Sequence, residues 1–324
     1  MFRASKFRAL MVAFFIIALG LSTTTFAVQK KSQKAKKPMP TGTPVMWREP
    51  TDIATRDLFH GSGGEAGKPD ASSLTLIEKV KGGFSEKYRV RDAAGREWVA
   101  KVSREAQSET AAVRLLWAVG YVTEVTYLLP TVNIAGTPKG TYENVRFEAR
   151  SKDVKRLDPW LWEKNPFSGK RELQGLKVMM LLLNNWDIKD DNNGILHVRN
   201  EAGESELHYI VSDLGATFGK IGSGPLWALK RSRNNPGDYA ESKFVDHVHK
   251  DRVFFHYGGK MQSLFEDISV ADVQWIAGLL SRLSDQQLGD AFRAANYNQE
   301  EVGLLTSAVR ARINELVNLP PSES

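Results

Sequence analysis

The segment Asn184–Gly215, NNWDIKDDNNGILHVRNEAGESELHYIVSDLG, combines residue types and spacings that indicate a chemical site. Asp187 follows an apolar run, and Asn192 comes five positions later with Lys189 between them. Asp213 lies near the end of the segment, just after a short run that is typical of a strand. Carboxylate and amide oxygens are ligands that Mg²⁺ prefers. Phosphoryl transfer needs such ligands and a group that orients the nucleophile, so the spacing indicates this chemistry.

The composition of the 324-residue chain is that of an ordinary globular protein, with 42% hydrophobic and 25% charged residues. The chain has no cysteine, which excludes disulfides, thiolate metal sites and a cysteine nucleophile. Eight basic residues precede residue 38 in a region without acids, so the net charge of +6 arises there and the remainder is nearly neutral. We therefore expect no nucleic-acid partner.

Residues 1–27 have the pattern of a secretory signal peptide. Basic residues precede the apolar run Ala9–Leu21, and a small-residue site predicts cleavage after Ala27. The sequence thus predicts a periplasmic or secreted protein. The alternative is an uncleaved membrane anchor, because five lysines follow the run and would hold the main domain in the cytoplasm. The membrane would then be contacted only through this segment, and residues 28–45 predict a flexible linker rich in Lys and Pro.

The region 46–150 predicts a small sheet lobe. Three strands are expected at Leu74–Val80, Tyr88–Asp92 and Glu97–Val102, and glycines occupy the first turn. A glycine turn by itself is common in ordinary β-hairpins. A lysine on a strand often serves only to discourage aggregation at a sheet edge. The order of the two features, a glycine turn followed by Lys101 on the third strand, favours a nucleotide site.

One helix and two further strands complete this expected lobe. Ser103 is a suitable N-cap for a helix at 105–119, which carries Glu109 in its second turn. Strands are expected at Val122–Leu128 and Val145–Ala149, on either side of a glycine-containing turn. The sequence therefore predicts a mostly antiparallel sheet with one helix.

The region 151–324 predicts a mainly helical lobe. The helix Lys170–Leu183 has an apolar face and leads into the segment that contains Asp187. His247 and His249 lie within an expected hairpin, 244–257, where they could share one face and hold a metal. The long segment 216–236 is a candidate for substrate contacts because of its position in a loop. Closing helices are expected at Val270–Arg282, Asp285–Ala294 and Gln299–Leu316.

Three motifs resemble those of the protein-kinase-like superfamily. Val99-Ala100-Lys101 resembles its lysine strand, 187–192 matches its Asp-x-Lys-x-x-Asn loop, and Asp213-Leu214-Gly215 resembles its Asp-Phe-Gly motif. The resemblance covers roughly residues 74–315 and is closest to the atypical branches, namely the HipA-like, CotH-like, lipid-kinase-like and secretory-pathway kinases. It implies an α+β, two-lobed protein-kinase-like fold, with a nucleotide-binding lobe at 46–150 and a catalytic lobe at 151–324.

The resemblance also implies cofactors, ATP or another nucleotide and Mg²⁺, and a role for each candidate residue. In the sheet lobe, Gly82, Gly83 and Ser85 would cover phosphates with backbone N–H groups. Lys101 would bind the α- and β-phosphates and pair with Glu109, for which Glu105 is a weaker alternative.

In the helical lobe, Asp187 would orient the attacking hydroxyl or accept its proton, and Lys189 would screen the transferred phosphate. Asn192 and Asp213 would be the Mg²⁺ ligands. Four features depart from the family pattern. Asn185-Trp186 replace the usual His-Arg, and no Ala-Pro-Glu motif follows Asp213. The glycine loop is also minimal, and only eight residues separate Lys101 from Glu109.

The function expected from these residues is phosphoryl transfer to a hydroxyl of a protein, lipid or glycan. The alternative is a catalytically inactive kinase-like scaffold of the cell envelope. A third reading treats Asp187, Asn192 and Asp213 as turn chemistry in an envelope structural domain. That reading predicts that Lys101 lies beyond a side chain's reach of Asp213.

Overall fold

The computed structural model describes residues 39–82, 85–222 and 230–323. The predicted signal peptide, its cleavage site at Ala27 and the predicted phosphate-binding Gly83 lie outside the described residues. Part of the predicted linker is ordered, because β1 (Thr43–Val45) pairs in parallel with residues 206–208. The linker prediction is therefore too long at its C-terminal end.

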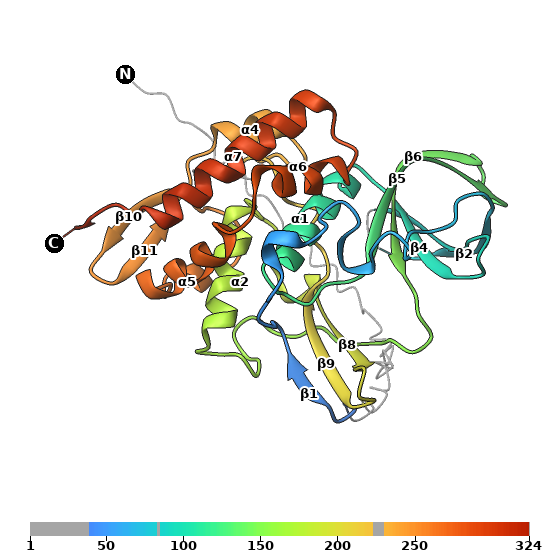
Figure 1. Ribbon diagram of the computed structural model, residues 1–324, viewed down its shortest axis with the longest axis horizontal. Coiled ribbons are helices and arrows are strands. Elements are labelled where there is room, and N and C mark those ends of the chain that lie inside the picture. Colours follow the sequence, from blue (N-terminus) through green and yellow to red (C-terminus); the bar gives the residue numbers. More distant parts are fainter. Residues whose placement is uncertain (1–38, 83–84, 223–229, 324) are drawn as a thin grey trace, which may run out of the picture. The chain divides into compact units, whose positions relative to one another are not determined.

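Five strands close into a barrel at one end of the fold (Figure 1). Their order around the barrel is β2-β3-β4-β6-β5, and all neighbours are antiparallel except β2 and β5. The interior is filled by alternate side chains such as Tyr88, Trp98 and Phe147. The strands are β2 (Leu74–Val80), β3 (Glu86–Arg91), β4 (Glu97–Val102), β5 (Thr126–Ala135) and β6 (Thr141–Ala149).

The fourth strand of this lobe was expected at 122–128; the strand is present, but its predicted bounds are wrong. Strand β5 begins at Thr126 and continues beyond Pro130, a residue that normally ends a central strand. The ladder pairs Leu129 with Val145 and Thr131 with Glu143, so its register is the same on both sides of Pro130. Beyond Pro130, the strand pairs in parallel with β2 and closes the barrel.

Helix α1 (Ala106–Ala118) joins the barrel to the rest of the fold. It packs on β5 and β6 on one side and on helix α6 (Asp285–Arg293) on the other. Its N-cap is Glu105 instead of the predicted Ser103, whose hydroxyl accepts a hydrogen bond from the Glu105 N–H at 3.2 Å. Eleven of its residues are buried, as expected of a helix enclosed by two lobes.

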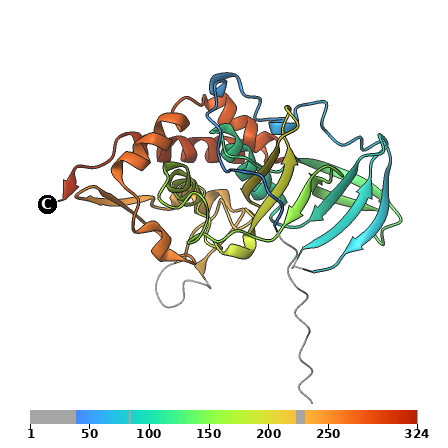
Figure 2. The ribbon, with the colours of Figure 1, turned by 90° about the horizontal axis from the view of Figure 1, so that it is seen from below.

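The second lobe combines helices with a small sheet (Figure 2). Helix α2 (Arg171–Leu182) is buried and ends just before Asp187, as its apolar sequence predicts. The sheet has the order β1-β9-β8-β7, and β8 (Asn193–Arg199) and β9 (Ser205–Val211) form the hairpin between Asn192 and Asp213. Strand β7 (Lys155–Leu157) follows the connection between the lobes.

The C-terminal part confirms the predicted hairpin and the three predicted closing helices. Capping boxes at Ser269, Ser284 and Asn298 start these helices. The elements are α4 (Pro236–Glu241), β10 (Val245–His249), β11 (Arg252–Phe255), α5 (Val270–Leu280), α6, α7 (Gln299–Val317) and β12 (Ser322–Glu323). A sheet lobe with one helix followed by a mainly helical lobe confirms the predicted α+β fold class.

Candidate active site

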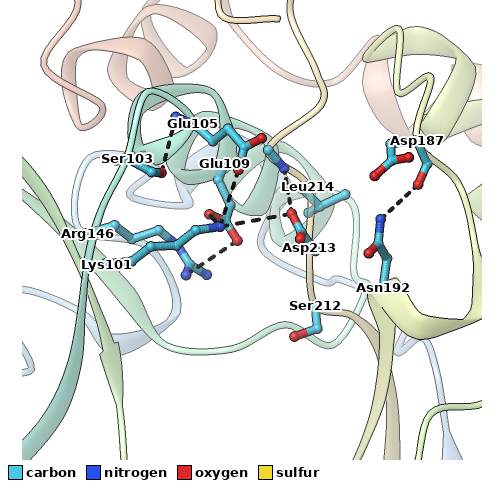
Figure 3. Close-up of polar contacts among 12 residues, drawn as sticks. Lys101, Ser103, Glu105, Glu109, Arg146, Asp187, Asn192, Ser212, Asp213 and Leu214 are labelled. Atoms are coloured by element: carbon cyan, nitrogen blue, oxygen red, sulfur yellow. Dashed lines mark hydrogen bonds and ion pairs between the residues drawn. The ribbon is translucent and has the colours of Figure 1, made fainter. Parts of the chain in front are cut away.

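The centre of the site is a buried ion pair between strand β4 and helix α1. The Lys101 ammonium lies 2.7 Å from Glu109 Oε2, and both side chains are buried (Figure 3). Glu105 Oε2, the alternative partner, is 3.7 Å away. Because α1 begins a few residues after β4, this pairing follows from local chain geometry, as the sequence predicts.

Arg146 extends the pair, and sequence analysis missed it. It lies opposite Lys101 in the β4–β6 ladder, so both side chains point to the same face of the barrel. Its Nη1 lies 3.4 Å from Glu109 Oε1, so Glu109 bridges two buried cations. Because the apolar Val145 and Phe147 flank Arg146 on the strand, the sequence indicates that Arg146 points to the other face. Its partner, Glu109, could not be found in this way because the contact depends on the register of β4 and β6.

Electrostatics keep these two cations charged. Burial alone would lower the pKa of Lys101, but the charges of Glu109 and Asp213 outweigh burial and raise it. Burial would also lower the pKa of Arg146, and Glu109 and Glu148 outweigh it in the same way. The cluster is therefore a fixed, charged arrangement at neutral pH.

A second set of ion pairs connects this cluster to the segment between the lobes. Arg146 Nη1 lies 3.2 Å from Glu148, and Arg156 lies 2.7 Å from the same carboxylate. Arg156 also pairs with Glu124 and donates to the Ser212 hydroxyl at 3.1 Å. Since Ser212 directly precedes Asp213, these contacts help to hold Asp213 near Lys101.

The loop 187–192 is joined to Asp213 by backbone contacts. The short 3-10 helix η3 (Asp190–Asn192) turns Asn192 back, and its side-chain N–H donates to the Asp187 carbonyl at 2.8 Å. The Asn192 carbonyl accepts from the N–H groups of Ser212 and Asp213 at 2.8 and 3.0 Å. The structure thus brings the predicted proton acceptor and both predicted metal ligands together.

Two lysines hold the Asp187 carboxylate. Lys189 lies 3.2 Å from Oδ2, and Lys260 pairs with Oδ1. Burial alone would raise the pKa of Asp187, but the hydrogen bonds from both lysines outweigh burial and lower it. Sequence analysis missed Lys260, which lies far along the chain and in no recognisable motif.

Asp213 completes the cluster next to the Lys101 ammonium. Its Oδ1 lies 4.0 Å from the Lys101 ammonium and accepts a hydrogen bond from the Gly215 N–H at 3.2 Å (Figure 3). A Cβ on Gly215 would lie 2.7 Å from the Glu105 Cβ, so the third motif position requires glycine. Asp213 lies within reach of the Lys101 side chain, so the separation that would favour the turn-chemistry reading is not found.

The oxygen donors suit a magnesium ion that binds together with phosphates. The Asp213 side chain is 48% exposed, and Asn192 uses its N–H group on Asp187, which leaves its amide oxygen available. No three of the described His, Cys, Asp and Glu residues form a metal-binding group. Mg²⁺ commonly uses one or two protein oxygens, with substrate phosphates and water as the other ligands.

His247, one of the two histidines of the possible metal site, makes other contacts. The His247 ring stacks on Phe254 with ring centroids 4.6 Å apart, and its Nδ1 lies 3.1 Å from Asp246. Across the described ranges, neither histidine belongs to a metal-binding group. We attribute His247 to packing of the β10–β11 hairpin.

Gly82 and Ser85 are the described residues of the candidate phosphate loop. Gly82 has φ +98°, which favours glycine, and Ser85 lines a groove of about 1060 Å³ with residues 102–105 and 231–235. From this last range, Arg233 pairs with Glu105. Part of the predicted substrate segment 216–236 therefore lines this groove next to the candidate phosphate loop.

Trp186 directly precedes Asp187, where the family pattern has an arginine. Its ring is buried, and the guanidinium carbons of Arg231 and Arg233 lie 4.0 and 4.7 Å from its centroid. Its indole N–H donates to the Ser232 carbonyl at 2.8 Å. In this chain, the segment after Asp213 is thus held to the Asp187 loop by cation–π contacts.

A small sheet lobe with a buried Lys–Glu pair, followed by a mainly helical lobe with these two Asp motifs, defines a protein-kinase-like fold. No protein-family model matches the chain. A search of curated protein sequences also found no match.

Solved structures of kinases are similar to the chain. The proinflammatory kinase CtkA of Helicobacter pylori is 12% identical, with a TM-score of 0.46 over 76% of this chain and 95% of that chain. The Rio2 kinase of Chaetomium thermophilum, solved as an ADP/Mg²⁺-phosphoaspartate complex, is 11% identical, with a TM-score of 0.30 over 77% and 74%. The Golgi casein kinase is 9% identical, with a TM-score of 0.30 over 76% and 74%. Because these identities and TM-scores are low, any assignment of chemistry must come from the side chains of this chain.

Proposed function

We propose that the protein is a Mg²⁺- and nucleotide-dependent phosphotransferase that acts on a hydroxyl of a protein, lipid or glycan. The observation that carries this proposal is the position of the Lys101 ammonium, 2.7 Å from Glu109 and 4.0 Å from Asp213. A cation for the α- and β-phosphates and a candidate metal ligand thus meet from two different lobes. Phosphoryl transfer relies on such positioning more than on covalent chemistry by the protein.

The proposed reaction assigns a step to each of these residues. The acceptor oxygen forms a bond to the terminal phosphorus, and the bond from phosphorus to the leaving diphosphate breaks with its electron pair on the diphosphate oxygen. The acceptor proton passes to Asp187, and Lys101 holds the remaining phosphates. Asn192 and Asp213 would hold Mg²⁺, which supplies charge neutralisation on the phosphate oxygens.

Magnesium-dependent nucleotide binding gives the first test. With Mg²⁺ and ATP at about 100 times Kd, we expect the melting temperature to rise by about 5 °C. Asp213→Ala removes the carboxylate beside Lys101 and should abolish the magnesium-dependent part of this rise. Differential scanning fluorimetry measures both. The matched control is Asp191→Ala, an exposed carboxylate in the same region, which should keep the full rise.

The alternative function, an inactive scaffold, predicts different results. Absence of any rise at millimolar nucleotide would refute nucleotide-dependent transfer and favour the scaffold. A rise without any transfer of ³²P from ATP to water or to an added hydroxyl acceptor would also favour the scaffold, in a nucleotide-binding form.

We also propose that the protein is exported. The proposal is supported by the pattern of residues 1–27 alone. In the described residues, no helix has the length and apolar character needed to cross a bilayer. Expression in a bacterium should give a mature protein that begins at Val28, as measured by N-terminal sequencing. An intact N-terminus in the membrane fraction would instead support the uncleaved anchor.

A further inference from the structure

Lys260 reaches the reaction centre from a segment that no recognised motif includes. It follows β11 by only a few residues, yet its ammonium pairs with Asp187 Oδ1. Lys189 takes the other oxygen at 3.2 Å, so the carboxylate lies between two lysines. Both lysine side chains are about two-fifths exposed, at 41% and 43%, and are therefore accessible to a ligand.

The segment that carries Lys260 is built onto the Asp187 loop. The Lys260 N–H donates to the Trp186 carbonyl at 3.1 Å. The Tyr257 hydroxyl, which is buried, lies 3.0 Å from the carbonyl oxygens of both Asn185 and Lys260. These contacts fix the backbone of Lys260 next to the two residues that precede Asp187.

Gly259 makes this approach possible. A Cβ at this position would lie 2.9 Å from the Trp186 Cα and would overlap the Tyr257 hydroxyl. A side chain would therefore push the segment away from the loop. The close approach indicates that the backbone around Gly259 positions Lys260 at Asp187, and that the contact is not that of a freely moving surface lysine.

Lys260 adds a positive charge that Lys189 alone does not supply beside Asp187. Asp187 with Lys189 alone would form a neutral pair, and Lys260 makes the cluster positive. A phosphoryl group that transfers beside Asp187 carries negative charge on its equatorial oxygens, and nearby cations stabilise that charge. A lysine within hydrogen-bond distance of the proton acceptor lies close enough to reach these oxygens.

We propose that Lys260 is a further cation of the reaction centre, which contacts the phosphoryl group while it passes from the donor to the acceptor oxygen. This inference rests on the proposed function. The bonds that form and break, and the transfer of the proton to Asp187, are those given above. Lys260 keeps its proton and moves between Asp187 and the phosphoryl oxygens.

The test uses ADP, Mg²⁺ and aluminium fluoride, a probe that imitates the phosphoryl group in transit. In the parent protein, ADP and Mg²⁺ should raise the melting temperature, and aluminium fluoride should raise it further. Lys260→Met should keep the first rise and lose at least half of the second, while Lys260→Arg should keep most of the second. Gly259→Ala should behave like Lys260→Met, because it displaces the same side chain.

The matched control is Lys220→Met. Lys220 is 48% exposed and pairs with Asp238, which is 19% exposed, whereas Lys260 and Asp187 are 43% and 21% exposed. This variant should keep both rises. Full retention of the second rise in Lys260→Met, or no second rise in the parent protein, would overturn the inference and leave nucleotide binding intact. If ADP and Mg²⁺ give no rise in the parent protein, the proposed function and this inference fail together.

Discussion

The Glu109→Gln variant is expected to be about 3 to 5 kcal/mol less stable than the parent protein. Glu109 is 2% exposed and faces the Lys101 ammonium at 2.7 Å and Arg146 Nη1 at 3.4 Å. Glutamine keeps the shape but removes the charge, so two buried cations lose their shared anion. A buried charge without its partner costs far more than the pair contributes as a unit. Urea denaturation followed by circular dichroism measures the loss.

The same variant should also lose nucleotide binding, because Lys101 no longer has the anion that positions it. Glu78→Gln is a suitable control, since Glu78 pairs with Arg89 at the surface and is 58% exposed. It should change stability little, as is usual for exposed ion pairs. A loss below about 1 kcal/mol in Glu109→Gln would show that Lys101 and Arg146 find other anions, such as Glu105 or Glu148.

The Asp187→Asn variant is expected to transfer phosphate about 10²- to 10⁴-fold more slowly than the parent protein. Asparagine fits the same space and keeps one oxygen for a lysine, but it cannot accept the proton of the hydroxyl. Nucleotide binding should remain, because Lys101 and Asp213 are unchanged. Release of ³²P-phosphate from labelled ATP, with water as the acceptor, gives the rate.

Asp191→Asn is the control for this experiment, because Asp191 is an exposed carboxylate in the same loop. It should leave the rate unchanged. If Asp187→Asn retains the rate within a factor of about ten, Asp187 is not the proton acceptor. The lysine pairs at Asp187 would then serve only to hold the loop.

Several parts of the site follow from sequence because their partners are close along the chain. Lys101 and Glu109 are joined by the short link between β4 and α1, so a strand followed at once by a helix brings them together. Asp187 and Asn192 lie in one loop, and the β8–β9 hairpin returns the chain to Asp213. Their roles as nucleotide and metal ligands stay predictions until binding is measured.

The local sequence pattern gave the wrong bounds for strand β5. The fourth strand of the barrel was expected to end at Leu128, but it continues through Pro130, although proline removes a ladder hydrogen bond. The partner strand β6 keeps the same register on both sides of Pro130, and its Asn144 has a positive φ of 49°. The parallel pairing of β2 with β5 then closes the barrel. Closure depends on two strands far apart in sequence, so periodicity within either strand does not reveal it.

The sequence by itself determined the α+β fold class, the position of most helices and strands, and the residue types that suit phosphoryl transfer. These depend on periodicity, capping and short spacings, which are properties of neighbouring residues. Only the tertiary structure decided that Arg146 shares Glu109 with Lys101 and that Lys260 reaches Asp187. Both contacts arise from strand register and from packing of distant segments, and neither leaves a signal in the local pattern.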